Sequence, residues 1–222
     1  FMIAGDRCTR ACGFCAVDTA KPFPLEQDEP QRVAEGVKRL GLKHVVITAV
    51  ARDDLADGGA DHFGQTIEAI RALDPKIVIE VLVPDFNGKD APLQRVLEAA
   101  PDVFNHNLET VERLTPLVRS RAKYRLSLDF LKRAGELRPD IMTKSGLMLG
   151  LGETEIELFQ AMDDLRESGV KVLTLGQYLR PTPNHLPVVE FINPETFELY
   201  GTIARKKGFE FVASGPLVRS SY

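Results

Sequence analysis

Three cysteines lie within eight residues near the start of the chain, in the segment Cys8-Thr-Arg-Ala-Cys12-Gly-Phe-Cys15. Thiolates separated by three and then two residues can converge on one metal centre from a single loop, and Gly13 lets the backbone fold tightly around it. An iron–sulfur cluster suits this set, because three soft thiolates hold three irons and leave the fourth open for another ligand. The motif therefore predicts a cluster with one exchangeable position.

Two other uses of the cysteines remain open. A closed structural zinc site needs a fourth ligand, and the histidines are all remote in sequence: His44, His62, His106 and His185. A redox dithiol of Cys12 and Cys15 would leave Cys8 without a role. The iron–sulfur cluster is the favoured interpretation.

The composition is that of an ordinary globular protein. The chain has 222 residues, 44% of them hydrophobic, with 28 Lys and Arg against 32 Asp and Glu for a net charge of −4. This composition excludes a disordered chain and collagen-like repeats. The slightly acidic net charge also gives no indication of a nucleic-acid-binding protein, which would be clearly basic. No apolar run approaches the roughly 18 residues of a membrane span. The chain has only three cysteines, all in one short segment, which favours a reducing compartment. This would be the cytoplasm or, in a eukaryote, an organelle matrix.

Short apolar runs recur along the chain and predict β-strands. Their near-continuous apolar character indicates burial on both faces of a parallel sheet. Six strand–helix units in this length predict an α/β fold, a partial (β/α)6 TIM-like barrel that forms one domain over residues 1–222. The predicted strands are 1–5, 44–50, 77–83, 103–108, 144–150 and 172–178, with a final strand at 209–213.

Amphipathic helices are predicted between these strands. Val33, Val37 and Leu40 recur at helical spacing before Gly41, which favours a helix end. Thr154-x-x-Glu157 is a capping box that opens a helix ending at Gly169, and Asn193-Pro194 opens another.

Polar and glycine-rich segments follow several predicted strands, where a barrel carries its ligand site. Turns and solvated loops have the same composition, so the residues alone leave both interpretations open. The segments are 48–59 with Asp53 and Asp54, 105–110 with Asn107 and Glu109, 144–154 with Lys144, Gly150 and Glu153, and 177–182 with Arg180.

The cysteine motif, with Phe14 directly before its last cysteine, resembles that of the radical S-adenosylmethionine (SAM) enzymes. The resemblance implies a radical SAM type of barrel and a [4Fe–4S] cluster on Cys8, Cys12 and Cys15. It also implies that the open iron binds the amino and carboxylate groups of SAM. In these enzymes SAM is cleaved reductively to a 5′-deoxyadenosyl radical.

The polar segments and the terminal Arg219-Ser220-Ser221-Tyr222 together resemble the lipoyl synthase family over essentially the whole chain. The resemblance implies insertion of two sulfur atoms at C6 and C8 of an octanoyl group on a lysine of an acidic lipoyl carrier protein. It implies a second, auxiliary [4Fe–4S] cluster that supplies the sulfur, with Ser221 as a ligand and Ser220 beside it. It also implies an electron donor such as flavodoxin or ferredoxin.

The same resemblance implies a set of residues around bound SAM. Four of them, Asn107, Glu109, Lys144 and Arg180, are expected at the carboxyl ends of strands. The full set is Phe14, Asp53, Asp54, Asn107, Glu109, Lys144, Gly150, Glu153 and Arg180. Another sulfur-inserting radical SAM enzyme, similar to biotin synthase, is the alternative activity.

Two features bear on this resemblance. The family's auxiliary-cluster cysteines form a C-x4-C-x5-C motif upstream of the radical motif, and no such motif precedes Cys8. We expect that segment, and a C-terminal tail, to lie outside these 222 residues. The positive residues Arg119, Arg121, Lys123 and Arg125 form either a solvated loop and helix start or a docking patch for the acidic carrier.

Overall fold

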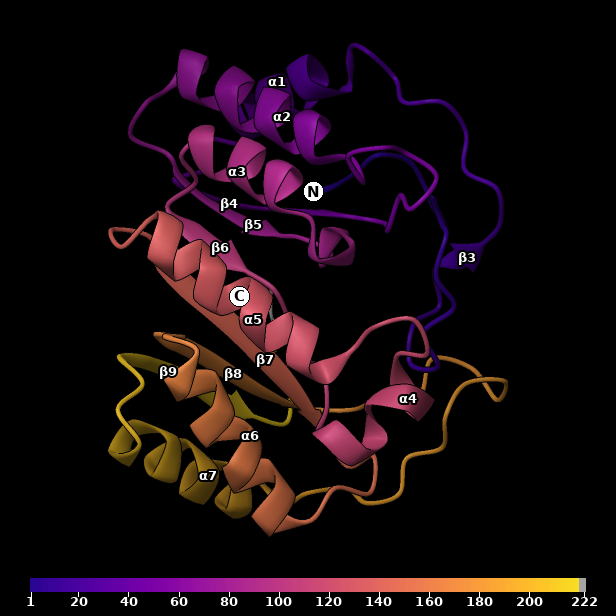
Figure 1. Ribbon diagram of the computed structural model, residues 1–222, viewed down its shortest axis with the longest axis vertical. Helices are drawn as coiled ribbons and strands as arrows, with labels where there is room; N and C mark the ends of the chain where they lie inside the picture. Colours follow the sequence, from indigo (N-terminus) through magenta and orange to yellow (C-terminus); the bar gives the residue numbers. More distant parts are fainter. Residues whose placement is uncertain (220–222) are drawn as a thin grey trace. The chain divides into compact units, whose positions relative to one another are not determined.

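The computed structural model describes residues 1–219 and divides the chain into two compact units (Figure 1). The first unit comprises Phe1–Arg10, Val17–Asn105 and Glu136–Ile141. The second comprises Ala11–Ala16, His106–Gly135 and the chain from Met142 onward. The cysteine motif is thus shared, because Cys8 belongs to the first unit and Cys12 and Cys15 to the second.

The first unit is built on parallel strands paired in the order β1, β4, β5, β6. Its helices carry apolar faces at helical spacing, such as Phe63, Ile67 and Ile70 in α2, which are fully buried. Helix α1 packs beside α2, and α2 beside α3 (Figure 1). The bounds are β1 Met2–Ile3, β2 Arg7–Cys8, β3 Asp18–Thr19, α1 Glu29–Arg39, β4 His44–Ala49, α2 Ala60–Leu73, β5 Val78–Leu82, η1 Phe86–Gly88, α3 Asp90–Glu98 and β6 Val103–Asn105.

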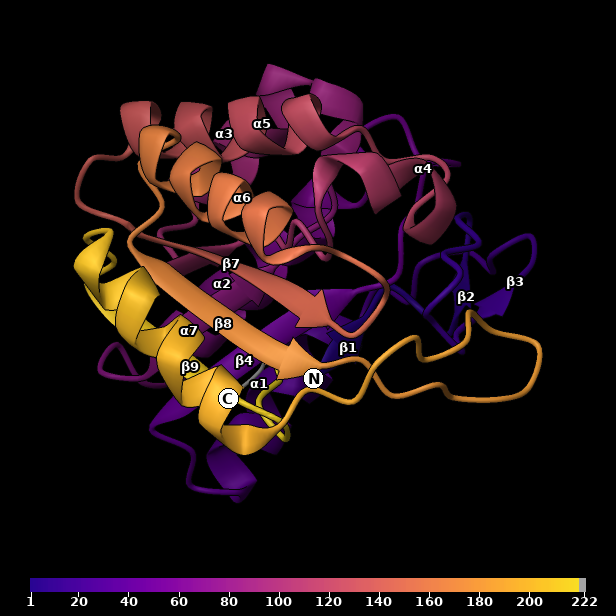
Figure 2. The same ribbon diagram turned by 90° about the horizontal axis from the view of Figure 1, so that it is seen from below.

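The second unit is built on the parallel strands β7, β8 and β9, which pair in this order. Figure 2 shows β7 and β8 side by side, with α6 and α7 lying along them. The bounds are η2 Glu112–Leu114, α4 Thr115–Val118, α5 Tyr124–Leu137, β7 Met142–Leu149, α6 Glu155–Glu167, β8 Val172–Gln177, α7 Pro194–Lys206 and β9 Phe211–Gly215.

The two faces of β7 and β8 differ in chemistry. Leu147, Leu149, Leu173 and Leu175 alternate along β7 and β8 and join one apolar core with residues of α5, α6 and α7. Because side chains alternate across a strand, the other face carries the residues between them. These are Lys144, Gly146 and Met148 on β7 and Thr174 and Gly176 on β8. That face carries two glycines, Thr174 and Lys144 beside the apolar Met148, so it is less apolar than the leucine-rich face.

Most of the predicted elements are confirmed. Each predicted strand overlaps an observed one, and every pairing named above is parallel. Thr154 and Glu157 form the predicted reciprocal capping box, and Asn193 caps α7 by accepting from the Thr196 N–H. The last strand begins two residues later than predicted, because Phe209 is buried in the core rather than in the sheet.

The short strands β2 and β3 were not predicted, since two-residue polar strands carry no apolar pattern. Among residues 1–219, no helix is both long enough and apolar enough to cross a membrane.

Candidate functional site

Cys8 is the last residue of β2, which pairs with β3 in the first unit. The chain that follows it is tightly held. The Thr9 N–H donates to the carbonyl of Ala51 at 3.0 Å, and the Arg10 N–H donates to the Cys8 sulfur at 3.4 Å. Because Ala51 follows β4, this loop is anchored just beyond the carboxyl end of that strand.

Arg10 is the centre of a buried ionic network. Its Nε and Nη2 donate to the two oxygens of Asp53, each at 2.8 Å. Its Nη1 and Nη2 donate to the two oxygens of Asp85 at 3.0 and 2.7 Å, and Nη2 also donates to Asn87 at 3.3 Å. The Arg10 guanidinium holds the pKa of Asp53 down at about 2. Asp53 was expected to contact SAM, but its carboxylate is instead bonded to Arg10 of the cysteine loop.

Asp54 is bonded in the same way to an arginine of its own loop, Arg52. Both of its oxygens accept from the Arg52 guanidinium at 2.9 Å, and Arg52 also donates to the carbonyls of Ala4 and Phe23. The polar segment after β4 is thus not an ordinary solvated turn. Its two aspartates fix two different stretches of backbone.

The second half of the cysteine motif is held within the second unit. Gly13 donates to the carbonyl of Val118 at 2.9 Å and accepts from the Leu186 N–H at 3.0 Å. His185 Nε2 lies 3.0 Å from the carbonyl oxygen of Cys15. A methyl group on Gly13 would lie 2.9 Å from the Leu186 side chain, so a larger residue there would force that side chain to shift. Phe14 packs against the unit's apolar core.

Arg180 organises the segment that makes these contacts. Its Nε donates to the carbonyl of His185 at 2.9 Å, and its Nη2 contacts the carbonyl of Pro183. Arg180 follows β8, as predicted, but its guanidinium holds the loop that reaches Cys15. This loop contact was not foreseen, because nothing in the sequence links Cys15 to His185.

Asn107 and Gly146 form a polar cradle on the small-residue face of the second unit. A methyl group on Gly146 would lie 2.5 Å from Thr174 Oγ1 and 3.0 Å from Asn107 Oδ1. Within the part of the chain that the structure describes, Asn107 Oδ1 is buried without a hydrogen-bond partner, and so is Thr110 Oγ1. Buried polar atoms are rarely left unpaired, so these two mark a place for a ligand's polar groups.

Glu109 adopts a left-handed backbone conformation with φ of +68°, which is strained for a residue other than glycine. The conformation is locked, because its N–H donates to the carbonyl of Gly146 and its own carbonyl accepts from Met148. Burial raises the pKa of the Glu109 carboxyl, against the opposing effects of the Arg119 charge and a hydrogen bond from Asn107. The carboxylate thus lies in a site that penalises its charge.

Two expected positions need correction. Lys144 is the third residue of β7, since that strand begins at Met142, so it does not lie at the strand's carboxyl end.

Arg119 does not belong to a surface patch, because it is buried and donates to the carbonyls of Asn107 and Leu108. Arg125 is exposed but pairs with Glu112 at 2.7 Å. The four positive residues are therefore not one continuous docking surface.

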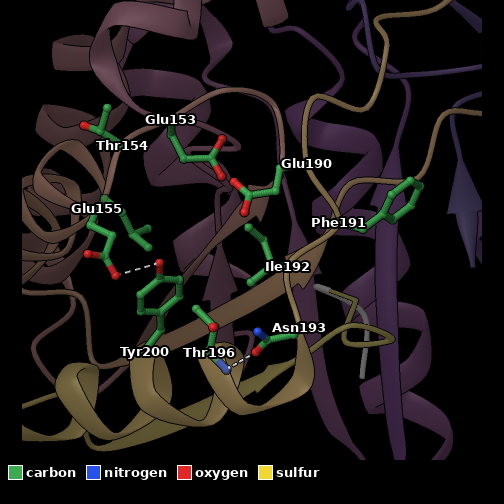
Figure 3. Close-up of a pocket in the computed structure, with 10 residues that line it drawn as sticks. Glu153, Thr154, Glu155, Glu190, Phe191, Ile192, Asn193, Thr196 and Tyr200 are labelled. Atoms are coloured by element: carbon green, nitrogen blue, oxygen red, sulfur yellow. Dashed lines mark hydrogen bonds between the residues drawn. The ribbon is translucent and has the colours of Figure 1, made fainter.

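The glycine-rich segment after β7 ends beside a pocket of about 430 Å³ (Figure 3). Glu153 closes the turn at Gly150, since its carboxylate accepts from the N–H groups of Gly150 and Leu151 at 2.6 and 3.0 Å. Burial raises the pKa of Glu153, and the nearby Glu190 charge adds to the rise. In Figure 3 the Glu153 and Glu190 carboxyl groups lie close to one another at the pocket, while Tyr200 donates to Glu155.

The cysteines suit an iron–sulfur cluster by the chemistry of their donors. Three half-buried thiols in one short loop provide soft ligands, and both flanks of the loop are anchored by hydrogen bonds. Among residues 1–219, no three His, Cys, Asp or Glu side chains are gathered closely enough to hold a metal ion. Ser221, the expected auxiliary ligand, lies outside the described residues.

Known proteins match this chain in sequence and in fold. Residues 2–165 match the Radical SAM superfamily. A lipoyl synthase of Shouchella clausii is 56% identical over the whole chain, which covers 72% of that protein. One of Geobacillus thermodenitrificans is 57% identical over the whole chain, which covers 74% of it.

Solved structures share the fold at low identity. SuiB of Streptococcus suis bound to S-adenosylmethionine has a TM-score of 0.73 at 13% identity, over 96% of this chain and 49% of that one. Methylornithine synthase (PylB) has a TM-score of 0.67 at 13% identity, over 100% of this chain and 73% of that one. At such identity the likeness shows the fold alone.

Proposed function

The chain belongs to the lipoyl synthase family of radical SAM enzymes, and we propose that Cys8, Cys12 and Cys15 hold its radical [4Fe–4S] cluster. The predicted family and the predicted α/β fold of radical SAM type are confirmed by the sequence and structural matches. The activity is the insertion of sulfur into a protein-bound octanoyl group to make the lipoyl cofactor. The substrate is accordingly a lipoyl carrier domain.

The family's cluster and SAM supply, when bound, a radical able to remove hydrogen from saturated carbon. The protein must orient SAM and keep water and other hydrogen donors away. We assign SAM binding to the cradle of Asn107 and Gly146, with Glu109 and Gly150 on its flanks. The support is the buried Asn107 Oδ1 that lacks a hydrogen-bond partner, which lies so close to Gly146 that a methyl group there would be 3.0 Å from it. SAM offers the matching groups, since its ammonium and ribose hydroxyls donate hydrogen bonds.

The remaining expected residues receive supporting roles in this proposal. Asp53 and Asp54 hold loops through Arg10 and Arg52, and Glu153 and Arg180 hold turns through backbone contacts. Phe14 packs against the apolar core of the second unit and so anchors the segment between Cys12 and Cys15. Lys144 is buried on the face that carries Gly146, where its charge suits the carboxylate of SAM.

Three further parts of the proposal come from the family. A second, auxiliary cluster supplies the sulfur and takes Ser221 as a ligand. An electron donor such as flavodoxin or ferredoxin reduces the radical cluster. The reducing conditions that both clusters need agree with a location in the cytoplasm or an organelle matrix.

Anaerobic reconstitution with iron and sulfide tests the radical cluster. The protein should bind about four irons at the three cysteines, and with dithionite it should convert SAM to 5′-deoxyadenosine. Replacing Cys8, Cys12 or Cys15 singly by alanine should abolish this cleavage while the far-ultraviolet circular dichroism stays that of the parent. Cleavage at the parent rate in any of the three variants would refute the assignment.

Product analysis tests the reaction. In a chain that also carries the family's upstream cysteine motif, an octanoyl-lysine peptide should gain two sulfur atoms by mass spectrometry. In that chain Ser221→Ala should keep SAM cleavage and impair sulfur insertion, because it removes one ligand of the auxiliary cluster only. If biotin-like precursors rather than octanoyl peptides were converted, the alternative radical SAM activity would be the correct one.

A further inference from the structure

The turn after β5 is strained without an evident structural need. Phe86 and Asn87 have φ of +45° and +54°, and Gly88 follows at +72°, so three successive residues are left-handed. A side chain in this region is disfavoured by about 1–2 kcal/mol per residue. Such strain persists where the surrounding structure over-determines it, and it gathers at functional positions.

Asp85 and Asn87, at the start and in the middle of this turn, both accept hydrogen bonds from Arg10. Asp85 is almost fully buried, at 1% exposure. Its Oδ1 accepts from the Asn87 N–H at 3.0 Å, which fixes the turn, and from Arg10 Nη2 at 2.7 Å. The turn therefore holds a carboxylate rigidly against a guanidinium that lies within the cysteine motif.

Arg10 in turn fixes the backbone around Cys8. Its guanidinium is held by both oxygens of Asp53 and both oxygens of Asp85. Its carbonyl accepts from Thr19 Oγ1 at 3.3 Å, and its N–H points at the Cys8 sulfur. A planar guanidinium held on two sides by bidentate carboxylates has little freedom to rotate, and a lysine could not replace both pairs of bonds.

We propose that Asp85, with Asp53, clamps Arg10 as a positioning group for Cys8, so that the sulfur and the N–H that bonds to it are preorganised for the radical cluster. This inference rests on the proposed function. It assigns Arg10, Asp53 and Asp85 no contact with substrate or SAM. Outer groups that orient a metal ligand typically change metal affinity 10- to 100-fold when they are replaced, and hydrogen bonds to cluster sulfurs set the reduction potential.

Arg10→Lys and Asp85→Asn test the clamp. Arg10→Lys keeps the positive charge but loses the planar guanidinium that bonds to both carboxylates. Asp85→Asn keeps the shape of the side chain but replaces one carboxylate by a neutral amide. Both variants are reconstituted anaerobically, and the release of cluster iron to a chelator is timed by absorbance. We expect release at least about 10-fold faster than from the parent protein. We also expect a more negative midpoint potential, because the N–H bond to the Cys8 sulfur is loosened.

Arg52→Lys is the matched control. Arg52 is also buried in the same unit and makes a bidentate pair with Asp54, but the residues to which it donates, Ala4, Phe23 and Asp54, lie outside the cysteine loop. Urea unfolding without iron gives the loss of stability for each variant. The clamp predicts that Arg52→Lys releases iron at the parent rate even where its stability loss equals that of Arg10→Lys.

Each result decides the matter. Parent-like iron release and potential in both Arg10→Lys and Asp85→Asn would overturn the clamp while leaving the proposed function intact. Equally fast release from Arg52→Lys would overturn it as well, because general destabilisation would then explain the effect. A parent protein that assembles no cluster would overturn the proposed function and the clamp together.

Discussion

Replacing Gly150 by alanine should destabilise the second unit, because Gly150 lies where two segments cross at the end of β7. Its φ is +93°, a conformation that side chains rarely adopt. Its carbonyl accepts from the Val189 N–H at 2.9 Å, and Gln177 bridges to the same segment by donating to the Glu190 carbonyl at 3.1 Å. An added methyl group would overlap the Glu190 carbonyl oxygen and the Gln177 side-chain nitrogen.

The magnitude follows from two separate effects. The left-handed backbone disfavours any side chain by about 1–2 kcal/mol. Forcing a methyl group into a packed crossing adds about 1–3 kcal/mol, since one colliding atom is backbone and cannot rotate away. The sum predicts that Gly150→Ala lowers the free energy of unfolding by about 2–5 kcal/mol.

Gly169→Ala separates the two effects. Gly169 follows α6 with φ of +78°, and an added methyl group would meet nothing within 4 Å. This variant carries the backbone strain alone and should lose about 1–2 kcal/mol. Urea unfolding monitored by circular dichroism gives the unfolding free energies of both variants, provided that the dependence of that free energy on urea concentration (the m-value) is unchanged. If the two variants lose the same free energy, the packing of residues 187–192 against Gly150 is not as described.

Two further predictions concern side-chain networks of the second unit. Tyr124→Phe should lower the free energy of unfolding by about 1.5–3 kcal/mol in urea titrations, because the buried hydroxyl donates to the Asp164 carboxylate at 2.9 Å; a parent-like midpoint would show that the bond is not formed. Glu157→Gln should destabilise near neutral pH, because the Arg113 guanidinium and the capping box hold the pKa of Glu157 at about 2, below its ordinary 4.5. A carboxyl group whose pKa is lower in the folded state stabilises the fold at pH values above its unfolded pKa. The difference in unfolding free energy between variant and parent should therefore fade as the pH falls from about 4.5 to about 2. A difference that stays constant over this pH range would contradict the prediction.

The strands, the parallel pairing and the helix caps could be predicted because their signals are local. Apolar runs predict strands, and the Thr154–Glu157 box lies within four residues. The long-range partners could not be predicted in this way. Arg10 bonds to residues 43 and 75 positions away, and only the folded chain shows that Asp53 and Asp85 face the same guanidinium. A positive charge inside the cysteine motif was the available signal, and composition alone gives it no partner.

The chemistry of the sheet faces was also only partly predictable. The sequence runs at β7 and β8 are nearly continuous in apolar character, which is typical of strands buried on both faces. In the folded unit one face is leucine-rich, whereas the other carries Gly146, Thr174 and Gly176. A period of two was present in the sequence, but glycine counts as neither apolar nor polar in such a pattern. The candidate SAM cradle was therefore located by its strand end, and its chemistry became visible only with the fold.

Backbone strain marks the same regions independently of any resemblance. In the described residues, φ is positive at five residues other than glycine: Ala4, Phe86, Asn87, Ala100 and Glu109. Ala100 ends a helix, where a left-handed residue is common. The other four follow the carboxyl ends of β1, β5 and β6. Since strand ends carry the ligand sites of parallel α/β proteins, strain there is better explained by the positioning of Asp85 and Glu109 than by the needs of the turns themselves.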